Sequence, residues 1–343
     1  MQRTEISAYG EFGLIKHLTE KFKIENPSTL KGVGDDAAVL SYENKKVLVT
    51  TDLLLEGIHF DLVYVPLMHL GYKAAVVNFS DIYAMNGTPK QITVSIGVSK
   101  RFSVEDLEQL YAGIQLACTK YGVDLIGGDT SASLTGLAIS VTCIGEADED
   151  KIVYRNGAKE NDLICVTGNL GSAYMGLQLL EREKVVFGAN SEAQPDFENR
   201  DYILQRQLKP EARKDIVELL AEKGVVPTSM MDISDGLSSE LLHICTQSNV
   251  GCRVYEDKIP INIQAVIMAE ELNMSIVTAA LNGGEDYELL FTVSLEDYDK
   301  IVGMEGVAMV GHITKPALGL QLVGREGDEI ELRAQGWNSL EEE

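Results

Sequence analysis

The stretch MHLGYKAAVVNFSDIYAMNGTPKQITVSIGV, residues 68–98, predicts a helix followed directly by a strand. Residues 68–85 carry apolar side chains at helical spacing, and the pattern stops at an Asn-Gly pair with proline just beyond it, which is a common way for a helix to end. Residues 91–98 alternate in the manner of a strand. A helix and a strand in such close succession indicate an α/β fold.

The flanking segments continue this alternation. Residues 46–52 (KVLVTTD) are rich in strand-forming side chains. Ser103 precedes an acidic first turn and predicts the N-cap of a helix that runs to about Tyr121. Residues 123–126 and 137–144 then predict two further strands. The first part of the chain therefore reads as alternating strands and helices.

The acidic segment 146–151 interrupts this pattern, and 343 residues suffice for about two domains. We therefore predict an N-terminal domain over residues 1–148 and a C-terminal domain over residues 149–343. The second half also mixes strands and helices, with a helix expected from about Ser172 and another opened by Pro210. Both domains are expected to be mixed α/β.

The formal net charge of −24 argues against nucleic acid or an anionic membrane as the main partner, since both require basic surface. No apolar run approaches the roughly 20 residues that span a bilayer, and the N-terminus lacks an apolar signal core. The five cysteines form no CxxC pair, and Cys143 and Cys165 lie in apolar strand-like runs that favour buried thiols. These features predict a reducing compartment, and we expect the cytoplasm.

Acidic residues in similar surroundings recur along both halves of the chain. They stand where an apolar run ends, beside Gly, Ser or Thr, so that a rigid element carries a carboxylate into a loop-lined cleft. Carboxylates gathered in one cleft repel one another unless cations hold them, and hard oxygen ligands suit Mg²⁺, which usually takes one or two carboxylates plus substrate phosphates. The pattern predicts a Mg²⁺-dependent enzyme acting on a phosphorylated nucleotide, and metal ions would also relieve the repulsion between phosphate and an acidic protein. The alternative is a solubilising acidic surface.

The DISDG motif, residues 232–236, illustrates the two interpretations. Asp and Ser side chains at such a place commonly form a turn and an N-cap. Alternatively, the helix N-terminus and Ser234 face phosphate while Asp232 and Asp235 hold metal.

The same choice applies to the other motifs. GDD (34–36) and GGDT (127–130) are either tight turns or ligand-binding loops. Asp81 lies in an apolar helical pattern, where a charge is costly unless it is paired, metal-bound or turned to solvent. His59 could be a satisfied core histidine, and Arg155 a surface charge or a phosphate-binding guanidinium. The common nucleotide motifs are absent from the sequence, which excludes a P-loop or a Rossmann dinucleotide site.

Taken together, the motifs resemble a known family, the thiamine-monophosphate kinases, which share a superfamily with aminoimidazole ribonucleotide synthetase and selenophosphate synthetase. The segments that carry the resemblance run in order along nearly the whole chain: GEFGLI, GVGDDAAVL, TTDLLLEGIHF, NFSDIYAMNGTP, LIGGDT, RNGAK, VTGNLGSA, DISDGLSSEL and GGEDYELLFTV. The TTD–GIHF and GGEDYEL segments are similar to the kinases rather than to their relatives. The catalytic Cys or selenocysteine expected of selenophosphate synthetases is missing.

The resemblance implies a PurM-like mixed α/β fold of two domains. The N-terminal sheet-and-helix domain would bind Mg-ATP and pair in a homodimer. The implied reaction, in thiamine biosynthesis, transfers the γ-phosphate of ATP to thiamine phosphate and yields thiamine diphosphate. The acceptor phosphate attacks directly, so no catalytic side chain is expected, and catalysis rests on positioning and on several Mg²⁺ ions.

By matching motif, the resemblance also implies three groups of site residues. The metal ligands, some through water, are Asp36, Thr50, Thr51, Asp52, Asp81, Asp129, Asp232 and Asp235. The nucleotide contacts are Tyr121, Gly128, Arg155 and Ser234. The contacts to thiamine phosphate are His59, Glu285 and Trp337.

Two rival functions remain open at this point. One is another ATP-dependent member of the superfamily, such as a purine-pathway synthetase that activates an amide oxygen. The other is a non-enzymatic acidic protein that binds Mg²⁺ or Ca²⁺ without turning over nucleotide.

Overall fold

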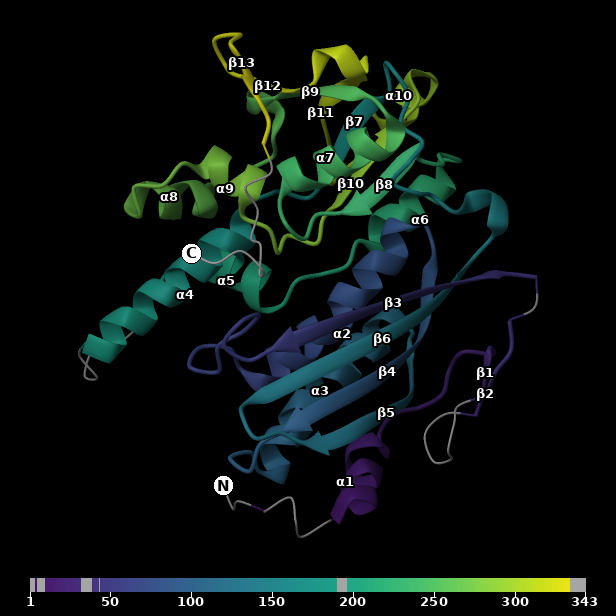
Figure 1. Ribbon diagram of the computed structural model, residues 1–343, viewed down its shortest axis with the longest axis vertical. Helices are drawn as coiled ribbons and strands as arrows, with labels where there is room; N and C mark the ends of the chain where they lie inside the picture. Colours follow the sequence, from purple (N-terminus) through teal and green to yellow (C-terminus); the bar gives the residue numbers. More distant parts are fainter. Residues whose placement is uncertain (1–3, 5–9, 32–38, 43, 190–195, 334–343) are drawn as a thin grey trace. The chain divides into compact units, whose positions relative to one another are not determined.

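The computed structural model describes residue 4 and residues 10–31, 39–42, 44–189 and 196–333 (Figure 1). The chain divides into two compact units, residues 1–152 and 153–343, which we call unit 1 and unit 2. The predicted boundary after residue 148 falls at the start of a short 3-10 helix, η2 (Glu149–Lys151). None of the helices in the described ranges is long and apolar enough to cross a membrane.

Unit 1 is built on a four-stranded sheet with the strand order β3-β6-β4-β5. Strand β6 pairs antiparallel with β3 and with β4, whereas β4 and β5 are parallel. The strands are β3 (Lys46–Leu55), β4 (Thr88–Val98), β5 (Asp124–Ala132) and β6 (Leu137–Ala147), and the small hairpin ahead of them is β1 (Thr29–Lys31) with β2 (Val39–Leu40). The helices are α1 (Gly10–Thr19), α2 (Leu67–Ala84) and α3 (Val104–Tyr121).

Helices α2 and α3 pack closely together behind the sheet in Figure 1. Glycines make this approach possible, because a Cβ on Gly71 would lie 1.9 Å from the carbonyl oxygen of Leu110 and a Cβ on Gly113 would lie 1.9 Å from that of Met68. Helix α3 begins at a capping box in which the Ser103 side chain accepts from the N–H of Asp106. The predicted helix, its exit, the strand that follows it and the Ser103 cap are all confirmed.

The two faces of the unit 1 sheet differ. On the face that α2 packs against, residues such as Ile139, Val141 and Cys143 of β6 are fully buried. On the opposite face of β3, Val49 is 65% exposed and Leu53 is 54% exposed. Successive side chains of a strand point to opposite faces of the sheet. In β3 the open face therefore also carries apolar side chains.

Unit 2 contains a seven-stranded sheet with the order β13-β12-β9-β11-β7-β10-β8, in which only β9 and β12 are parallel neighbours. Its strands are β7 (Leu163–Thr167), β8 (Ser229–Asp232), β9 (Gly251–Tyr255), β10 (Leu289–Val293), β11 (Val307–Thr314), β12 (Leu320–Val323) and β13 (Glu329–Glu331). Its helices are α4 (Ser172–Ala189), α5 (Asp201–Leu208), α6 (Lys214–Glu222), α7 (Leu237–Ser248), α8 (Ile263–Glu271), α9 (Ile276–Asn282) and α10 (Tyr298–Ile301), with the 3-10 turns η3 (Glu256–Lys258), η4 (Leu295–Asp297) and η5 (Pro316–Leu318).

The centre of this sheet is buried on both faces, since every residue of β10 is buried. Ile164, Leu290 and Ile244 of α7 belong to one hydrophobic cluster. The predicted helix start at Ser172 is confirmed. The predicted start at Pro210 is wrong, because Pro210 lies between α5 and α6. A favourable first-turn residue is only a local preference; here the helix begins after Arg213, whose side chain reaches inward to Glu288.

All five cysteines are free and buried. This confirms the prediction of buried thiols at Cys143 and Cys165.

Candidate functional site

Three of the predicted metal ligands of unit 1 lie together on the helix-covered face of the sheet. Thr50 and Asp52 alternate along β3, and the Thr50 hydroxyl donates to the Asp81 carboxylate of α2 at 2.6 Å. Burial raises the pKa of the nearby Cys143 thiol well above its usual value, and Cys118, Asp81 and Asp52 add to this effect. Asp81 is therefore half-buried and hydrogen-bonded, rather than simply turned to solvent.

Thr51 and Asp129 do not join this group. The Thr51 side chain points to the other face of β3, where it donates to the carbonyl oxygen of Val141 at 3.1 Å. Asp129 is exposed on β5, at the opposite edge of the sheet from β3. Three strand spacings separate these edges, or about 14 Å at ~4.8 Å per spacing. Within the described ranges, no three His, Cys, Asp or Glu side chains lie close enough to hold a metal ion by themselves.

Two predicted nucleotide contacts have evident packing roles in unit 1. Gly128 lies so close to β4 that a Cβ would stand 1.9 Å from the carbonyl oxygen of Val94. Tyr121 is 4% exposed, and its ring packs against those of Phe79 and Tyr83, with centroids 5.3 and 6.2 Å away. A contact between either residue and a nucleotide remains a prediction.

His59 lies exposed in a turn that follows β3. Its Nδ1 accepts the backbone N–H of Leu55 at 3.0 Å, so the neutral imidazole carries its proton on Nε2. The turn itself depends on Gly57, whose φ of +82° is in the left-handed region. This arrangement fixes the ring relative to the end of β3.

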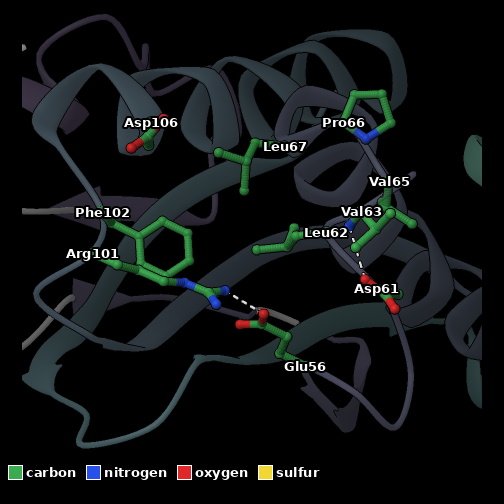
Figure 2. Close-up of a pocket in the computed structure, with 10 residues that line it drawn as sticks. All are labelled: Glu56, Asp61, Leu62, Val63, Val65, Pro66, Leu67, Arg101, Phe102 and Asp106. Atoms are coloured by element: carbon green, nitrogen blue, oxygen red, sulfur yellow. Dashed lines mark hydrogen bonds and ion pairs between the residues drawn. The ribbon is translucent and has the colours of Figure 1, made fainter. Parts of the chain in front are cut away.

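A cavity of about 550 Å³ adjoins this turn (Figure 2). Arg101 reaches across it to form an ion pair with Glu56, and the Asp61 carboxylate accepts the backbone N–H of Val63. The lining residues are Glu56, Asp61, Leu62, Val63, Val65, Pro66, Leu67, Arg101, Phe102 and Asp106. With three carboxylates and one guanidinium around an apolar floor, the cavity suits a cationic ligand better than an anionic one.

In unit 2, the DISDG motif connects β8 to α7. The N-cap of α7 is Gly236, and no side chain caps it, so neither Ser234 nor Asp235 has the capping role that a purely structural interpretation requires. The backbone N–H of Asp235 instead donates to Glu240 at 3.0 Å. Burial raises the pKa of Glu240 to about 8, with the charges of Asp235 and Asp232 adding to the effect. The turn thus holds three acidic side chains near one another.

The GGED loop, residues 283–286, lies against this turn. Its Glu285 N–H donates to the carbonyl oxygen of Ser234 at 2.7 Å, and a Cβ on Gly284 would lie 2.5 Å from the same oxygen. Burial raises the pKa of Asp235, His243 lowers it, and Glu285 raises it further. The structure therefore brings together Ser234, Asp235 and Glu285, which the sequence predicted for three different roles.

Of the three remaining predicted residues, the structure describes only Arg155. Arg155 is exposed ahead of β7, and its carbonyl oxygen accepts from the Ser248 hydroxyl at 3.4 Å. Asp36 and Trp337 lie outside the described residues.

Sequence reasoning missed a buried charge network directly behind the GGED loop. Glu288 is 1% exposed and accepts from Arg206 at 2.7 Å and from Arg213 at 2.5 Å. Asp286 is fully buried beside it. The sequence did offer a signal, since Asp286 and Glu288 directly precede the apolar strand β10. Acidic residues buried at such a place nearly always have a basic partner.

Comparisons with known proteins agree over most of the chain. Two family models match in order: "AIR synthase related protein, N-terminal domain" at residues 34–147 and "AIR synthase related protein, C-terminal domain" at residues 159–308. A thiamine-monophosphate kinase of Aquifex aeolicus is 36% identical over 301 residues, covering 88% of this chain and 91% of the relative. The corresponding protein of Bacillus subtilis is 35% identical over 306 residues, covering 89% and 90%. This chain belongs to the thiamine-monophosphate kinase family.

Solved structures of thiamine-monophosphate kinases share the fold. One, described as "AaThiL complexed with AMPPCP and TMP", has a TM-score of 0.75 and 32% identity and covers 99% of this chain and 100% of its own. The kinase of Stenotrophomonas maltophilia K279a has a TM-score of 0.79 at 29% identity, covering 94% and 98%. These likenesses confirm both the resemblance drawn from the motifs and the PurM-like mixed α/β fold.

Proposed function

We propose that this protein transfers the γ-phosphate of ATP to thiamine phosphate. An oxygen of the acceptor phosphate forms a bond to the γ-phosphorus, the bond from that phosphorus to the β–γ bridging oxygen breaks, and thiamine diphosphate and ADP result. The acceptor phosphate is already ionised near neutral pH, so no strong general base is needed. Positioning and charge neutralisation then carry the catalysis.

The observation that carries this proposal is the likeness to the relative described with AMPPCP and TMP, which extends over 99% of this chain at 32% identity. AMPPCP is an ATP analogue, and TMP is the phosphate ester that a thiamine-monophosphate kinase phosphorylates. Both substrate classes are therefore represented in one protein of the same fold and family. We assign the same pair of substrates to this chain.

The donor chemistry of both units fits Mg²⁺. Thr50, Asp52 and Asp81 in unit 1, and Asp232 and Asp235 in unit 2, are all hard oxygen donors, as Mg²⁺ requires. Bound Mg²⁺ ions would neutralise the phosphate charge. The hydroxyl of Thr50 fixes the orientation of the Asp81 carboxylate, and Gly236 leaves the amino end of α7 without a side-chain cap. That helix end is suited to a phosphate oxygen.

Two residues suit the acceptor. His59 is assigned to the thiamine phosphate group, because an imidazole N–H can donate to a phosphate oxygen, and the backbone N–H of Leu55 holds the ring through Nδ1. Glu285 supplies a carboxylate that suits the cationic ring system, and the phenol of Tyr287 donates to it at 3.1 Å. Trp337 and Asp36 keep the roles inferred from the motifs. Each assignment predicts a change in the Michaelis constant for one substrate when the residue is altered.

The test is direct. Incubation with MgATP and thiamine phosphate, followed by chromatography, should yield thiamine diphosphate and ADP in equal amounts. Unphosphorylated thiamine should fail as acceptor, because the attacking oxygen belongs to the phosphate, and EDTA should stop the reaction. Phosphorylation of thiamine itself, or ATP turnover only with a purine-pathway amide, would replace this assignment with another member of the superfamily. Metal binding without any nucleotide turnover would favour the non-enzymatic alternative.

We also propose that unit 1 pairs with a second copy through the open face of its sheet. The support is the row of exposed apolar side chains on β3, which include Val49 and Leu53. The substitution Val49→Glu should convert a dimer into a monomer in light scattering. The matched control Val226→Glu, at a 48% exposed valine of unit 2, should leave the dimer intact. A wild-type monomer at micromolar concentration would rule this pairing out.

The cytoplasm is the compartment that we propose for this activity. The five buried free thiols are consistent with a reducing environment. Thiamine diphosphate formation would then complete thiamine biosynthesis within the same compartment.

A further inference from the structure

The GGED loop has a backbone conformation that L residues avoid. Gly284, Glu285 and Tyr287 all have positive φ values, of +70°, +63° and +51°. Glycine adopts this region without strain, but Glu and Tyr persist there only where surrounding contacts determine it. The contacts that hold this loop therefore decide where the Glu285 carboxylate lies.

One set of contacts fixes the side of the loop nearest the DISDG turn. The N–H of Glu285 donates to the carbonyl oxygen of Ser234 at 2.7 Å, and the N–H of Tyr287 donates to that of Ile233 at 2.8 Å. These two bonds flank Asp286 in the sequence. They place Glu285 next to the turn that carries Asp235.

Asp286 anchors the opposite side of the loop. Its side chain is fully buried, and its Oδ2 accepts the backbone N–H of Gly171, at the amino end of α4, at 2.8 Å. Arg206 of α5 donates through Nη2 to the backbone carbonyl oxygen of Asp286 at 2.7 Å. The same guanidinium binds Glu288 through Nη1 at 2.7 Å. Arg206 thus holds the chain at two points, one at the end of the GGED loop and one just after it, on either side of Tyr287.

These contacts explain why glycines stand at both ends of the turn ahead of α4, residues 168–171. A helix N-terminus after such a turn is a ready site for an anion. In this structure the group at that position is the protein's own Asp286 carboxyl group. Gly168 leaves room for Glu288 in a similar way, because a Cβ there would lie 2.1 Å from its Oε1. The turn thus receives the chain's own carboxylates.

We propose that Asp286 is a positioning residue for Glu285. Seated on the amino end of α4 and held by Arg206, it keeps the GGED loop in its left-handed conformation and so aims the Glu285 carboxylate beside Asp235. Asp286 acts through Glu285 and touches no substrate itself. The inference rests on the proposed function in one respect, which is that Glu285 contacts thiamine phosphate.

The kinetic test compares Asp286→Asn, Glu285→Gln, the double variant and a matched control, Asp162→Asn. Asp162 is another buried acid of unit 2, and it accepts from the Lys159 N–H at 2.9 Å and the Thr228 hydroxyl at 2.6 Å. Asp286→Asn should raise KM for thiamine phosphate about ten-fold, which corresponds to ~1.4 kcal/mol of binding. KM for ATP should stay within about two-fold, and the double variant should be no worse than Glu285→Gln alone. Asp162→Asn should leave both constants unchanged.

A second measurement does not depend on activity. Hydrogen exchange of the Glu285 and Tyr287 amides should be slow in the wild type and clearly faster in Asp286→Asn, with no change in Asp162→Asn. Unchanged exchange in Asp286→Asn, additive kinetic effects in the double variant, or an equal KM change in Asp162→Asn would each overturn the proposal. If the wild type phosphorylates nothing, the proposed function fails, and the exchange result still decides the positioning role. If Asp286→Asn does not fold, Arg206→Lys takes its place with the same expected outcomes.

Discussion

In unit 1 the predicted metal ligands Asp52 and Asp81 stand on regular elements, whereas in unit 2 Asp235 and Glu285 stand in loops, and Arg206 holds the loop of Glu285. Asp52 and Asp81 belong to β3 and α2, and the Thr50 hydroxyl donates to Asp81. Asp235 and Glu285 lie outside helices and strands, and Glu285 adopts a positive φ. A regular element positions a side chain through its own backbone hydrogen bonds, but a loop needs tertiary anchors. Both units therefore position carboxylates, but unit 1 does so through regular secondary structure and unit 2 through tertiary contacts to a loop.

The largest expected effect concerns the buried ion pairs of Glu288 in unit 2. Arg213→Met removes one of two guanidinium partners of the buried Glu288 and should destabilise the protein by about 3–5 kcal/mol, the usual result of breaking a buried ion pair. The matched variant in unit 1 is Arg101→Met, whose guanidinium is 51% exposed and pairs with Glu56. That change should cost less than about 1 kcal/mol. Urea unfolding followed by circular dichroism would measure both, and equal midpoints for the two variants would break the comparison.

The next effect tests the regular elements of unit 1. Asp81→Asn keeps the side-chain shape but removes the charge next to Thr50. Turnover should fall by roughly 10²–10³-fold, as when one preorganised electrostatic group is lost, while the melting temperature stays close to wild type. Asp150→Asn, at an exposed acid of the same unit, serves as control and should leave turnover unchanged. Near wild-type turnover in Asp81→Asn would return this residue to a structural role.

A smaller effect concerns the close approach of β5 to β4. Gly128→Ala would place a methyl group 1.9 Å from the Val94 carbonyl oxygen, and Gly97→Ala on β4 would make only ordinary contacts at 3.6 and 3.8 Å. Forcing the strands apart should cost about 1–3 kcal/mol at Gly128. Gly97→Ala should remain within about 0.5 kcal/mol of wild type. Thermal unfolding distinguishes them, and the reverse order of stability would contradict the strand spacing described above.

The smallest effect is a pH dependence that unit 2 alone should show. Burial raises the pKa of Asp286 to about 7, against the lowering effect of Arg206. The groups that face it are the Arg206 and Tyr202 side chains of α5, the Glu288 carboxylate and the N–H groups of Gly171 and Ala173.

Because the folded-state pKa of Asp286 lies above the unfolded value, its contribution is complete at low pH and is lost as pH rises through about 7. The wild type should therefore be more stable at pH 6 than at pH 8 by on the order of 1 kcal/mol. Asp286→Asn should lack this difference. Urea midpoints at the two pH values provide the measurement, and an undiminished slope in the variant would assign the effect to another group.

Local sequence patterns predicted the regular elements of unit 1, but they did not predict the start of α6 in unit 2. The helix of residues 68–85, the strand after it and the Ser103 cap were predictable, because each depends on side chains a few positions apart. The family was predictable because its motifs survive in order along the chain. Pro210 misled the prediction, since its local preference for a helix start was outweighed by contacts made further along, at Arg213.

The sequence by itself determined the mixed α/β character of the fold and the family. Only the tertiary structure decided which carboxylates meet. Thr50 meets Asp81 across 31 positions, Arg206 meets the Asp286 carbonyl across 80, and Thr167 meets Glu288 across 121. Periodicity and capping depend on interactions between residues a few positions apart, so local sequence patterns predict them. Hydrogen bonds over such separations form only once the packing of the sheet and helices has brought their partners together, and no local pattern of residues encodes that contact.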